Sequence, residues 1–335
     1  MSGTKTGLSA TLMAGAALAG LSAGSAEAQD HRWNMHIAFP AGNFHTENAE
    51  AFADRVAEVT DGAVEITVHP AGALGLQGPE VMGAVRDGIV EAADYHLMQQ
   101  VGEAPLMGVN ALPYLAVGYD EAWTLNEIAR PYYEEIAADN NQVILYDVAW
   151  PGGQVYADRA IETRDDFSGV RIRTADSIQS QFFDELGAST VQMPWGDVVP
   201  GLASGVIDGV TTSTSSGVDG AFWEFLGHMT IMDYVNPISV MAVNLDAWNA
   251  LSDEHQEAIR TVADEMRPEF WARSEADDEE KLAKLEGEGI SVSTVEGDLH
   301  EAMVESGQAI WDDFIADVGT PAEEIITEYR SEIGR

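Results

Sequence analysis

Arg173 is the residue whose setting in the sequence points most directly to binding chemistry. It ends residues 170–173, where apolar and basic residues alternate in the period-2 pattern of a β-strand. A guanidinium presents a planar fork that can hold both oxygens of a carboxylate, and lysine lacks this geometry. We expect Arg173 to bind an anionic group. The alternative is a structural ion pair with an Asp, and Arg171 is expected to be a solvated surface charge.

Aromatic and polar residues follow other strand ends. Trp150 and Trp195 come directly after apolar segments that read as strands, and Phe39, Tyr95 and His96 end two more such segments. An indole face can cover an apolar ligand surface or bind a cation. The alternative for Trp195 is a core-capping role.

Two acidic residues bear on the charge of the ligand. Asp176 follows Arg173 by three residues, and Asp233 lies at the start of residues 232–244, which read as a strand. A carboxylate in a site that binds only an anion would weaken binding by repulsion. If either residue faces the ligand, the ligand should carry an amino group. The alternative is a position on the surface, which is what we expect for Asp94.

The elements that position these residues alternate between strands and helices. Residues 169–213 read as strand, helix, strand, helix and a polar turn, which indicates an α/β layer with a parallel sheet. Ligands of such sheets bind beyond the carboxyl ends of the strands. The N-terminal half repeats the rhythm, with strands at 36–39, 64–69, 89–96 and 143–149 and helices at 46–60 (capped by Thr46), 79–87 and 120–138.

The C-terminal part is predicted to join two lobes. Residues 232–244 read as a strand that crosses back to the first domain, 251–285 as one long amphipathic helix, and the remainder as a strand (290–295) and two helices (299–318, 322–331). We expect an α/β fold with a ligand cleft between an N-terminal lobe (29–150) and a second lobe (151–240). The segment 241–335 should pack across both lobes.

The net charge narrows the possible partners. With 16 Lys and Arg against 57 Asp and Glu, the chain has a formal net charge of −41. Such a surface would repel nucleic acid and anionic lipid. Eight Trp and ten Phe argue against disorder. An acidic shell that keeps a folded protein soluble in strong salt, and hence a halophilic source, is our hypothesis.

Residues 1–28 have the pattern of a cleavable export signal. Lys5 precedes a short Ala- and Gly-rich apolar run, and Ala26-Glu27-Ala28 is a small-x-small cleavage site. A membrane anchor is the alternative, but the run is too short to span a bilayer. There is no cysteine for a lipid anchor, a disulfide or a thiolate metal site. We therefore expect a diffusible periplasmic protein without stable membrane insertion.

Motifs of the common enzyme classes are not found. Beyond the predicted export signal the sequence contains no Gly-x-Ser-x-Gly elbow, and it has no His-Glu-x-x-His and no Walker-type phosphate loop. Its eight His show no metal-ligand spacing. We expect no cofactor and no catalytic activity. A periplasmic hydrolase built on Ser213, His96 and an Asp, or a sensor that docks a receptor, are remote alternatives.

Four short motifs of the chain resemble the solute-binding subunit of tripartite ATP-independent periplasmic (TRAP) transporters, the DctP-like family. They are Gly169-Val170-Arg171-Ile172-Arg173, Leu186-Gly187-Ala188, Met193-Pro194-Trp195 and Gly205-Val206-Ile207-Asp208-Gly209; further matches lie at 72–75, 85–88 and 112–114. The resemblance implies two lobes that close on a solute and deliver it to membrane permease subunits.

The resemblance also assigns roles to single residues. It implies that Arg173 clamps a ligand carboxylate, that Trp195 stacks on the ligand, and that His96 and Asp233 make polar contacts. The family often has Asn where this chain has Thr212, so the sequence departs from the pattern there.

The predicted ligand bears a basic nitrogen, as a zwitterion or a small amine. This follows from one arginine among two acids and two indoles, and from Gly153 and Gln154 near the place where a sialic-acid-binding relative has a second arginine. A plain mono- or dicarboxylate held by Arg173 is the alternative.

Overall fold

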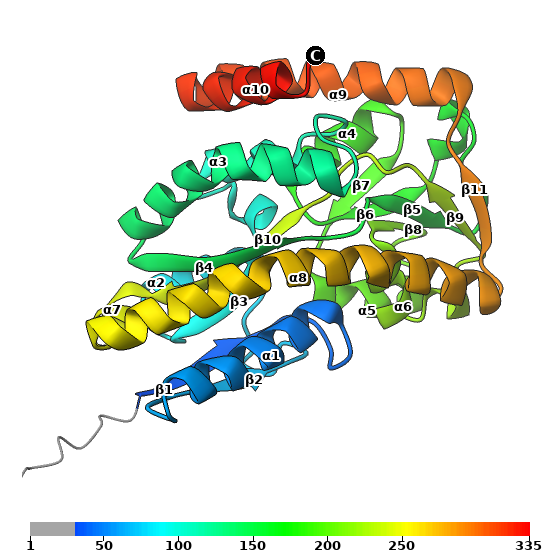
Figure 1. Ribbon diagram of the computed structural model, residues 1–335. Coiled ribbons are helices and arrows are strands. Elements are labelled where there is room, and N and C mark those ends of the chain that lie inside the picture. Colours follow the sequence, from blue (N-terminus) through cyan, green and yellow to red (C-terminus); the bar gives the residue numbers. More distant parts are fainter. Residues whose placement is uncertain (1–30) are drawn as a thin grey trace, which may run out of the picture.

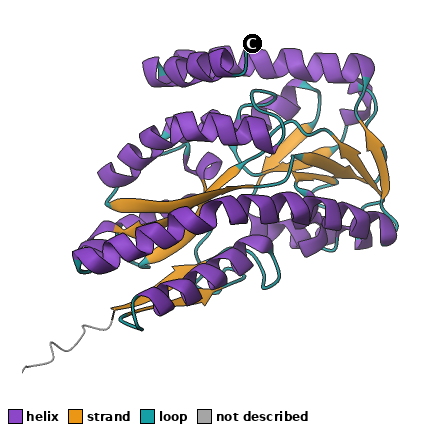
Figure 2. Cartoon of the chain, viewed as in Figure 1, coloured by secondary structure: helices purple, strands orange, loops and turns teal. Residues whose placement is uncertain are grey.

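The computed structural model describes residues 31–335 and contains two β-sheets flanked by helices (Figures 1 and 2). The predicted export signal lies outside the described residues. The first sheet has the order β2-β1-β3-β10-β4. Its strands are β1 (His31–His36), β2 (Val64–His69), β3 (Ala92–His96), β4 (Gln142–Ala149) and β10 (Ile238–Asn244).

The second sheet has the order β11-β9-β5-β8-β6-β7. Its strands are β5 (Gln154–Ala157), β6 (Arg171–Thr174), β7 (Ser189–Gln192), β8 (Gly209–Thr212), β9 (His228–Ile231) and β11 (Ser291–Thr294). The expected parallel arrangement holds for β7, β6 and β8, whereas β5 runs antiparallel to both β8 and β9. The carboxyl ends of β6 and β8 therefore meet at one edge, as the alternating pattern predicted.

Helices cover both sheets (Figure 2). The α-helices are α1 (Phe44–Val59), α2 (Val81–Arg86), α3 (Tyr119–Asp139), α4 (Ser177–Glu185), α5 (Val198–Ser204), α6 (Thr214–Asp219), α7 (Leu245–Asn249), α8 (Asp253–Gly287), α9 (Gly297–Val318) and α10 (Thr320–Glu332). Short 3-10 helices are η1 (Gly78–Glu80), η2 (Leu97–Gln100), η3 (Pro105–Ala111), η4 (Arg164–Phe167), η5 (Trp195–Asp197) and η6 (Phe222–Glu224).

The start of α1 differs from the prediction. Asn43, rather than Thr46, caps this helix, because its Oδ1 accepts a hydrogen bond from the backbone N–H of His45 at 2.9 Å. Thr46 lies inside the helix and donates to the carbonyl of Phe39 at 3.2 Å. Both residues are polar helix starters, so the sequence alone could not choose between them.

Two adjacent segments of chain cross between the lobes. Residues 150–153 run from β4 to β5, and residues 232–237 run back from β9 to β10. They are tied to each other by the backbone, since the amide of Trp150 donates to the carbonyl of Pro237 at 2.7 Å and that of Gly153 to Val235 at 2.8 Å. The crossing strand of the prediction is thus a loop followed by β10, which belongs to the sheet of the first lobe.

The C-terminal helices hold the two lobes from outside. The long helix α8 begins after the cap Ser252 and continues past Pro268, as Figure 1 shows, and it contacts α1 and β4 of the first lobe and α6 of the second. Helix α9 packs on α4 of the second lobe, and α10 packs on α3 of the first. The two-lobed α/β fold with a long C-terminal helix is confirmed.

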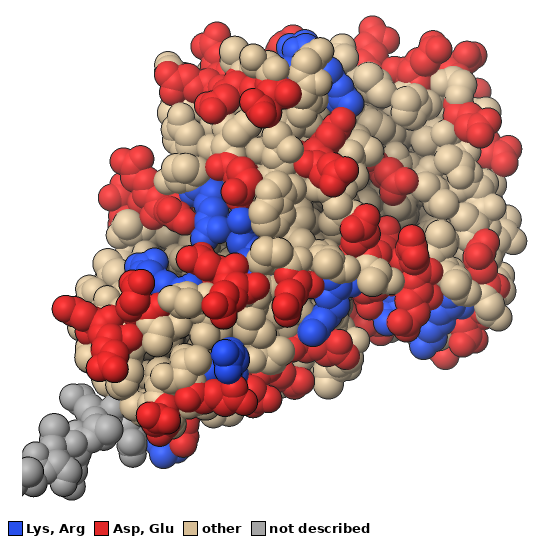
Figure 3. Space-filling model, viewed as in Figure 1, with Lys and Arg blue, Asp and Glu red and all other residues tan. Residues whose placement is uncertain are grey.

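Acidic side chains are spread over the face of the molecule that Figure 3 shows. Within residues 31–335, no helix combines the length and the apolar character that a membrane crossing would need. Because salt screens repulsion between surface carboxylates, we expect the free energy of unfolding, measured by urea titration, to rise between 0.1 and 3 M NaCl. A flat dependence would contradict the halophilic hypothesis.

Candidate functional site

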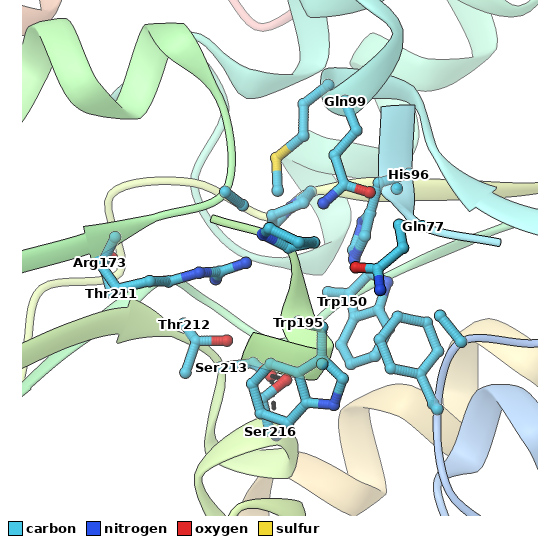
Figure 4. A pocket seen from close by; sticks show the side chains of 18 of the residues that line it. Gln77, His96, Gln99, Trp150, Arg173, Trp195, Thr211, Thr212, Ser213 and Ser216 are labelled. Atoms are coloured by element: carbon cyan, nitrogen blue, oxygen red, sulfur yellow. Dashed lines mark hydrogen bonds between the residues drawn. The ribbon is translucent and has the colours of Figure 1, made fainter. Parts of the chain in front are cut away.

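A cleft of about 170 Å³ lies between the lobes, and residues from both sheets and both crossing segments line it. Such a volume is below that of most drug-sized ligand pockets and suits a small solute. Figure 4 shows the guanidinium of Arg173 pointing toward the side where Gln77, Gln99 and His96 lie. The lining of the cleft also includes Phe39, Trp150, Trp195, Gln179, Tyr234 and residues 211–213.

Arg173 lies at the carboxyl half of β6, with only 3% of its surface exposed. Its Nε donates to the carbonyl of Met193 at 3.0 Å, and among residues 31–335 no carboxylate lies within 4.0 Å of its guanidinium. Burial lowers the pKa of Arg173 to about 10, so the side chain is still charged at neutral pH. A buried, charged guanidinium without a carboxylate partner is a site prepared for an anion.

Asp176 does not line the cleft, contrary to the prediction. It caps α4, because its Oδ1 accepts hydrogen bonds from the backbone amides of Ile178 at 2.7 Å and Gln179 at 3.0 Å. Burial raises the pKa of Asp176 to about 6, while the two amides and the charge of Arg173 act in the opposite direction. Asp176 is therefore a buried neighbour of Arg173 that does not line the cleft.

Asp233 also lies outside the cleft and lines a different cavity. Its Oδ1 accepts a hydrogen bond from Nε2 of Gln154 at 2.6 Å. The backbone of Asp233 has φ 43°, and this left-handed turn directs its side chain and that of Tyr234 to different sides of the crossing segment. Asp233 therefore does not line the cleft in which its polar contact was expected.

An aromatic wall closes the side of the cleft formed by the first lobe. Trp150 packs against Phe39 (ring centroids 4.6 Å apart) and His96 (5.1 Å), and it stacks on His45 at 4.3 Å. Its Nε1 donates to Oγ of Ser239 at 3.0 Å, so the ring is fixed in place. Burial lowers the pKa of His96 to about 3, which makes this imidazole neutral across the physiological range.

Tyr95 and Asp94, the neighbours of His96 on β3, point away from the cleft. The hydroxyl of Tyr95 donates to Oε1 of Gln142 at 3.1 Å inside the core, because alternate residues of a strand face opposite sides. Asp94 was expected on the surface, but it is buried and its Oδ2 lies 2.9 Å from Nδ1 of His45. Of the three residues that end this strand, only His96 lines the cleft.

Trp195 and Thr212 both line the cleft on the side of the second lobe. Trp195 begins η5 directly after β7, and its half-buried ring packs against the apolar cores of both lobes. This double contact places the indole where the lobes meet, and it fits both the binding role and the core-capping alternative. Trp223, which the cluster pattern placed in the core, is half-buried at its edge.

Several polar residues of the lining were not predicted from the sequence. Ser213 comes directly after β8, and Gln77 immediately precedes η1. The others lie in the first turn of η2, α4 and α6: Gln99, Gln179 and Ser216. Reading every polar residue at such positions as a candidate would have found most of them. Tyr234 could not be found this way, because the crossing segment that carries it has no regular pattern. Its hydroxyl lies 2.8 Å from Oγ1 of Thr211 and its ring stacks on Phe182 at 5.3 Å.

The lining determines what the cleft can bind. It contains one arginine, a neutral histidine, amides, hydroxyls and aromatic faces, and no Asp or Glu is among its residues. In the described part of the chain, no group of three or more His, Cys, Asp or Glu residues is placed to hold a metal ion. The arrangement can bind one carboxylate and hydrogen-bond a neutral polar body.

Comparison with known proteins agrees with this geometry. A family model described as bacterial extracellular solute-binding protein, family 7 (DctP), matches residues 35–317. The chain belongs to this family. Proteins of the solute-binding family are extracytoplasmic receptors for small solutes, which agrees with the resemblance seen in the sequence motifs.

Individual relatives of the family bind different solutes. A TRAP solute-binding protein from a marine metagenome, specific for pyroglutamate, is 31% identical and superimposes with a TM-score of 0.87 over 90% of this chain and 99% of its own. DctP7 of Bordetella pertussis, which binds pyroglutamic acid, is 26% identical with a TM-score of 0.87 over 89% of this chain and 99% of its own. The ectoine-binding periplasmic protein TeaA of Halomonas elongata is 23% identical over 85% of each chain.

Proposed function

We propose that this solute-binding protein captures a small monocarboxylate with a neutral, hydrogen-bonding body and delivers it to the membrane subunits of a TRAP transporter. The observation that carries the proposal is the buried Arg173, whose guanidinium has no carboxylate partner within 4.0 Å among residues 31–335. The protein acts in the periplasm after export and returns its ligand unchanged, as a receptor and not an enzyme.

A single carboxylate on the ligand fits the one arginine in the lining. Gly153 lies near the place where the resemblance puts a second arginine, but a Cβ there would come within 2.6 Å of the ring of Tyr234. Gln154 turns away from the cleft and donates to Asp233. A dicarboxylate would therefore bring its second charge among neutral groups, which would cost desolvation energy without a partner.

The rest of the ligand would meet amides, hydroxyls and aromatic rings. Gln77, Gln99 and Gln179 offer both donors and acceptors, and Trp150 and Trp195 offer flat apolar faces. A lactam carboxylate such as pyroglutamate has this combination of groups, and two solved relatives bind it. Their identities of 26% and 31% support the ligand class for this chain.

The prediction that the ligand bears an amino group is not supported by the residues that line the cleft. It depended on Asp176 and Asp233, and neither carboxylate is among the residues that line the cleft. A zwitterion remains the second candidate, because the aromatic wall around Trp150 can hold a cation and the relative TeaA binds ectoine.

A thermal-shift panel tests the proposal directly. Pyroglutamate and other small monocarboxylates should raise the melting temperature of the mature protein, because they bind the folded form alone. Succinate, ethanolamine and glycerol serve as a dicarboxylate, an amine and a neutral polyol. A shift with ethanolamine or succinate and none with any monocarboxylate would contradict the proposed ligand class.

Ligand affinity should depend on pH through Asp176. Below its pKa of about 6 this carboxyl becomes neutral, so its repulsion of an anionic ligand on Arg173 disappears while the ligand is still ionised. We expect carboxylate affinity, measured by calorimetry, to rise several-fold from pH 7.5 to pH 5.

Two variants isolate this effect. Asp176→Asn keeps a capping side chain, so it should bind the ligand tightly at both pH values. Asp278 also has a pKa raised by burial to about 6 but does not line the cleft, and Asp278→Asn should retain the parental pH dependence. An unchanged pH profile in Asp176→Asn would show that another group causes it.

A further inference from the structure

A second cavity, of about 490 Å³, lies on the other side of the crossing segments from the cleft. Its lining includes Met232 and Asp233 of the crossing segment, Tyr114, Trp311 of α9 and Arg330 of α10. This cavity therefore joins the C-terminal helices to the connection between the lobes.

The crossing segment separates the two cavities and is in contact with both. Tyr234 lines the cleft, whereas its neighbours Met232 and Asp233 line the second cavity. Gln154 is hydrogen-bonded to both Met232 and Asp233. Its Nε2 donates to Oδ1 of Asp233 at 2.6 Å, and its Oε1 accepts from the backbone amide of Met232 at 2.8 Å. A ligand that displaced these groups would move the segment that carries Tyr234.

Tyr114 links the cavity to the same segment by two further hydrogen bonds. Its hydroxyl donates to the carbonyl of Met232 at 3.1 Å, and its backbone amide donates to the carbonyl of Tyr234 at 2.7 Å. Tyr114 and Asp233 both have positive φ, 57° and 43°, although neither is glycine. Strained backbone of this kind is held in place by its surroundings and is concentrated at binding sites and switch regions.

The lining of the second cavity combines apolar surface with positive charge. Tyr114, Val304 and Trp311 supply apolar and aromatic surface, with the Trp311 ring held by its Nε1 donating to the carbonyl of Pro113 at 2.8 Å. Arg335 pairs with Glu121, but Arg330 has no carboxylate within 4.0 Å in the part of the chain that the structure describes. Arg330 is exposed at the edge of this cavity, so its guanidinium is free to meet the carboxylate of a ligand.

We propose that this cavity is a second binding site, for a small aromatic carboxylate, and that its occupant alters the opening of the lobes. The aromatic body packs against Tyr114 and Trp311, and the carboxylate is held by Arg330. The other ionisable groups of the lining are Tyr114, Asp233, His300, Tyr329 and Arg335. Because the two sites share the crossing segment, coupling between them is reciprocal.

Calorimetry with indole-3-acetate tests the site, and the neutral indole-3-ethanol tests the role of charge. Indole-3-acetate should bind the mature protein, and indole-3-ethanol should bind at least tenfold more weakly. Arg330→Ala should weaken indole-3-acetate binding at least tenfold. Arg273→Ala, which removes an exposed arginine of α8 outside this cavity, should leave it unchanged.

Two more variants exclude binding elsewhere. Val304→Trp narrows the cavity and should abolish binding while the circular dichroism spectrum stays that of the folded parent. Arg173→Ala disables the cleft and should still bind indole-3-acetate with parental affinity. Absence of binding by the parent, insensitivity to Arg330→Ala, or loss in Arg173→Ala would each overturn the proposal, and the last result would place indole-3-acetate in the cleft. The thermal-shift panel tests monocarboxylate binding in the cleft separately.

Lobe opening can be measured independently, because the chain contains no cysteine. Spin labels on Asp54→Cys of α1 and Ala203→Cys of α5, both exposed positions, report the distance between lobes. Indole-3-acetate should shift this distance distribution, and Val304→Trp should suppress the shift. Binding without any shift would refute the coupling.

Discussion

Arg173→Ala is expected to weaken carboxylate binding by about 2–5 kcal/mol, the usual effect of removing one partner of a buried charge pair. This corresponds to roughly 30-fold to several thousand-fold in the dissociation constant. Arg173→Lys should also bind poorly, because an ammonium cannot reproduce the bidentate fork. The measurement is calorimetry with whichever monocarboxylate gives the largest thermal shift.

The same substitution should not destabilise the ligand-free protein. Burial lowers the pKa of Arg173, which means that the folded state disfavours its charge, and without the ligand the charge of Asp176 offsets this only in part. Arg173→Met, which keeps much of the side-chain volume, should therefore unfold at the parental temperature or above. Arg171 is the matched control, since it is exposed and paired with Asp208, and Arg171→Ala should bind normally. Parental affinity in a folded Arg173→Ala would remove this residue from the site.

Asp147→Ala is expected to lower the free energy of unfolding by about 3–5 kcal/mol, because it leaves buried arginine charge without its partner. Asp147 lies on β4, and its Oδ1 accepts from Nε of Arg267 at 2.9 Å and from Nδ2 of Asn126 at 2.8 Å. Arg130 lies 3.6 Å from its Oδ2. The network joins β4 to α3 and α8, so its loss affects the packing of the first lobe.

Burial still raises the pKa of Asp147, against the effect of both arginines. Burying the charge of Asp147 with its two arginines costs free energy, and so does removing Asp147 once the arginines are buried. Asp147→Ala measures only the second of these costs. Asp208→Ala is the matched control, because it breaks the exposed pair with Arg171 and should cost less than about 1 kcal/mol. Both are measured by urea titration at constant salt. Equal losses in the two variants would show that the buried network does not stabilise the fold.

Sequence patterns predicted the strands and helices around Arg173 and the sheet edge at which the candidate site lies. The alternation at residues 170–173 and the strand–helix rhythm that follows depend on local periodicity, which survives in any tertiary context. They placed Arg173 and Trp195 at the carboxyl ends of β6 and β7, and both line the cleft. Asp176 stands immediately before a helix, so its role as an N-cap was also readable from the sequence.

The identity of the sheet to which a strand belongs was decided by tertiary structure. Residues 232–244 read as one strand, but the chain changes lobes at 232–237 and only β10 pairs with β3 and β4. Strand pairing over such separations depends on contacts that no local pattern encodes. The same segment contributes Tyr234 to the cleft, which is why that residue was missed.

The sequence by itself determined which side chains of a strand share a face. The tertiary structure decided which of these faces borders the cleft. Alternation tells which strand residues share a face, so Tyr95 and His96 had to lie on opposite faces, but it does not tell which face borders the cleft. Asp233 lies in an irregular turn whose positive φ directs its side chain toward a second cavity. Composition and periodicity therefore determined the fold class and the position of Arg173, whereas the charge of the cleft lining depended on which side each acidic side chain faces in the folded protein.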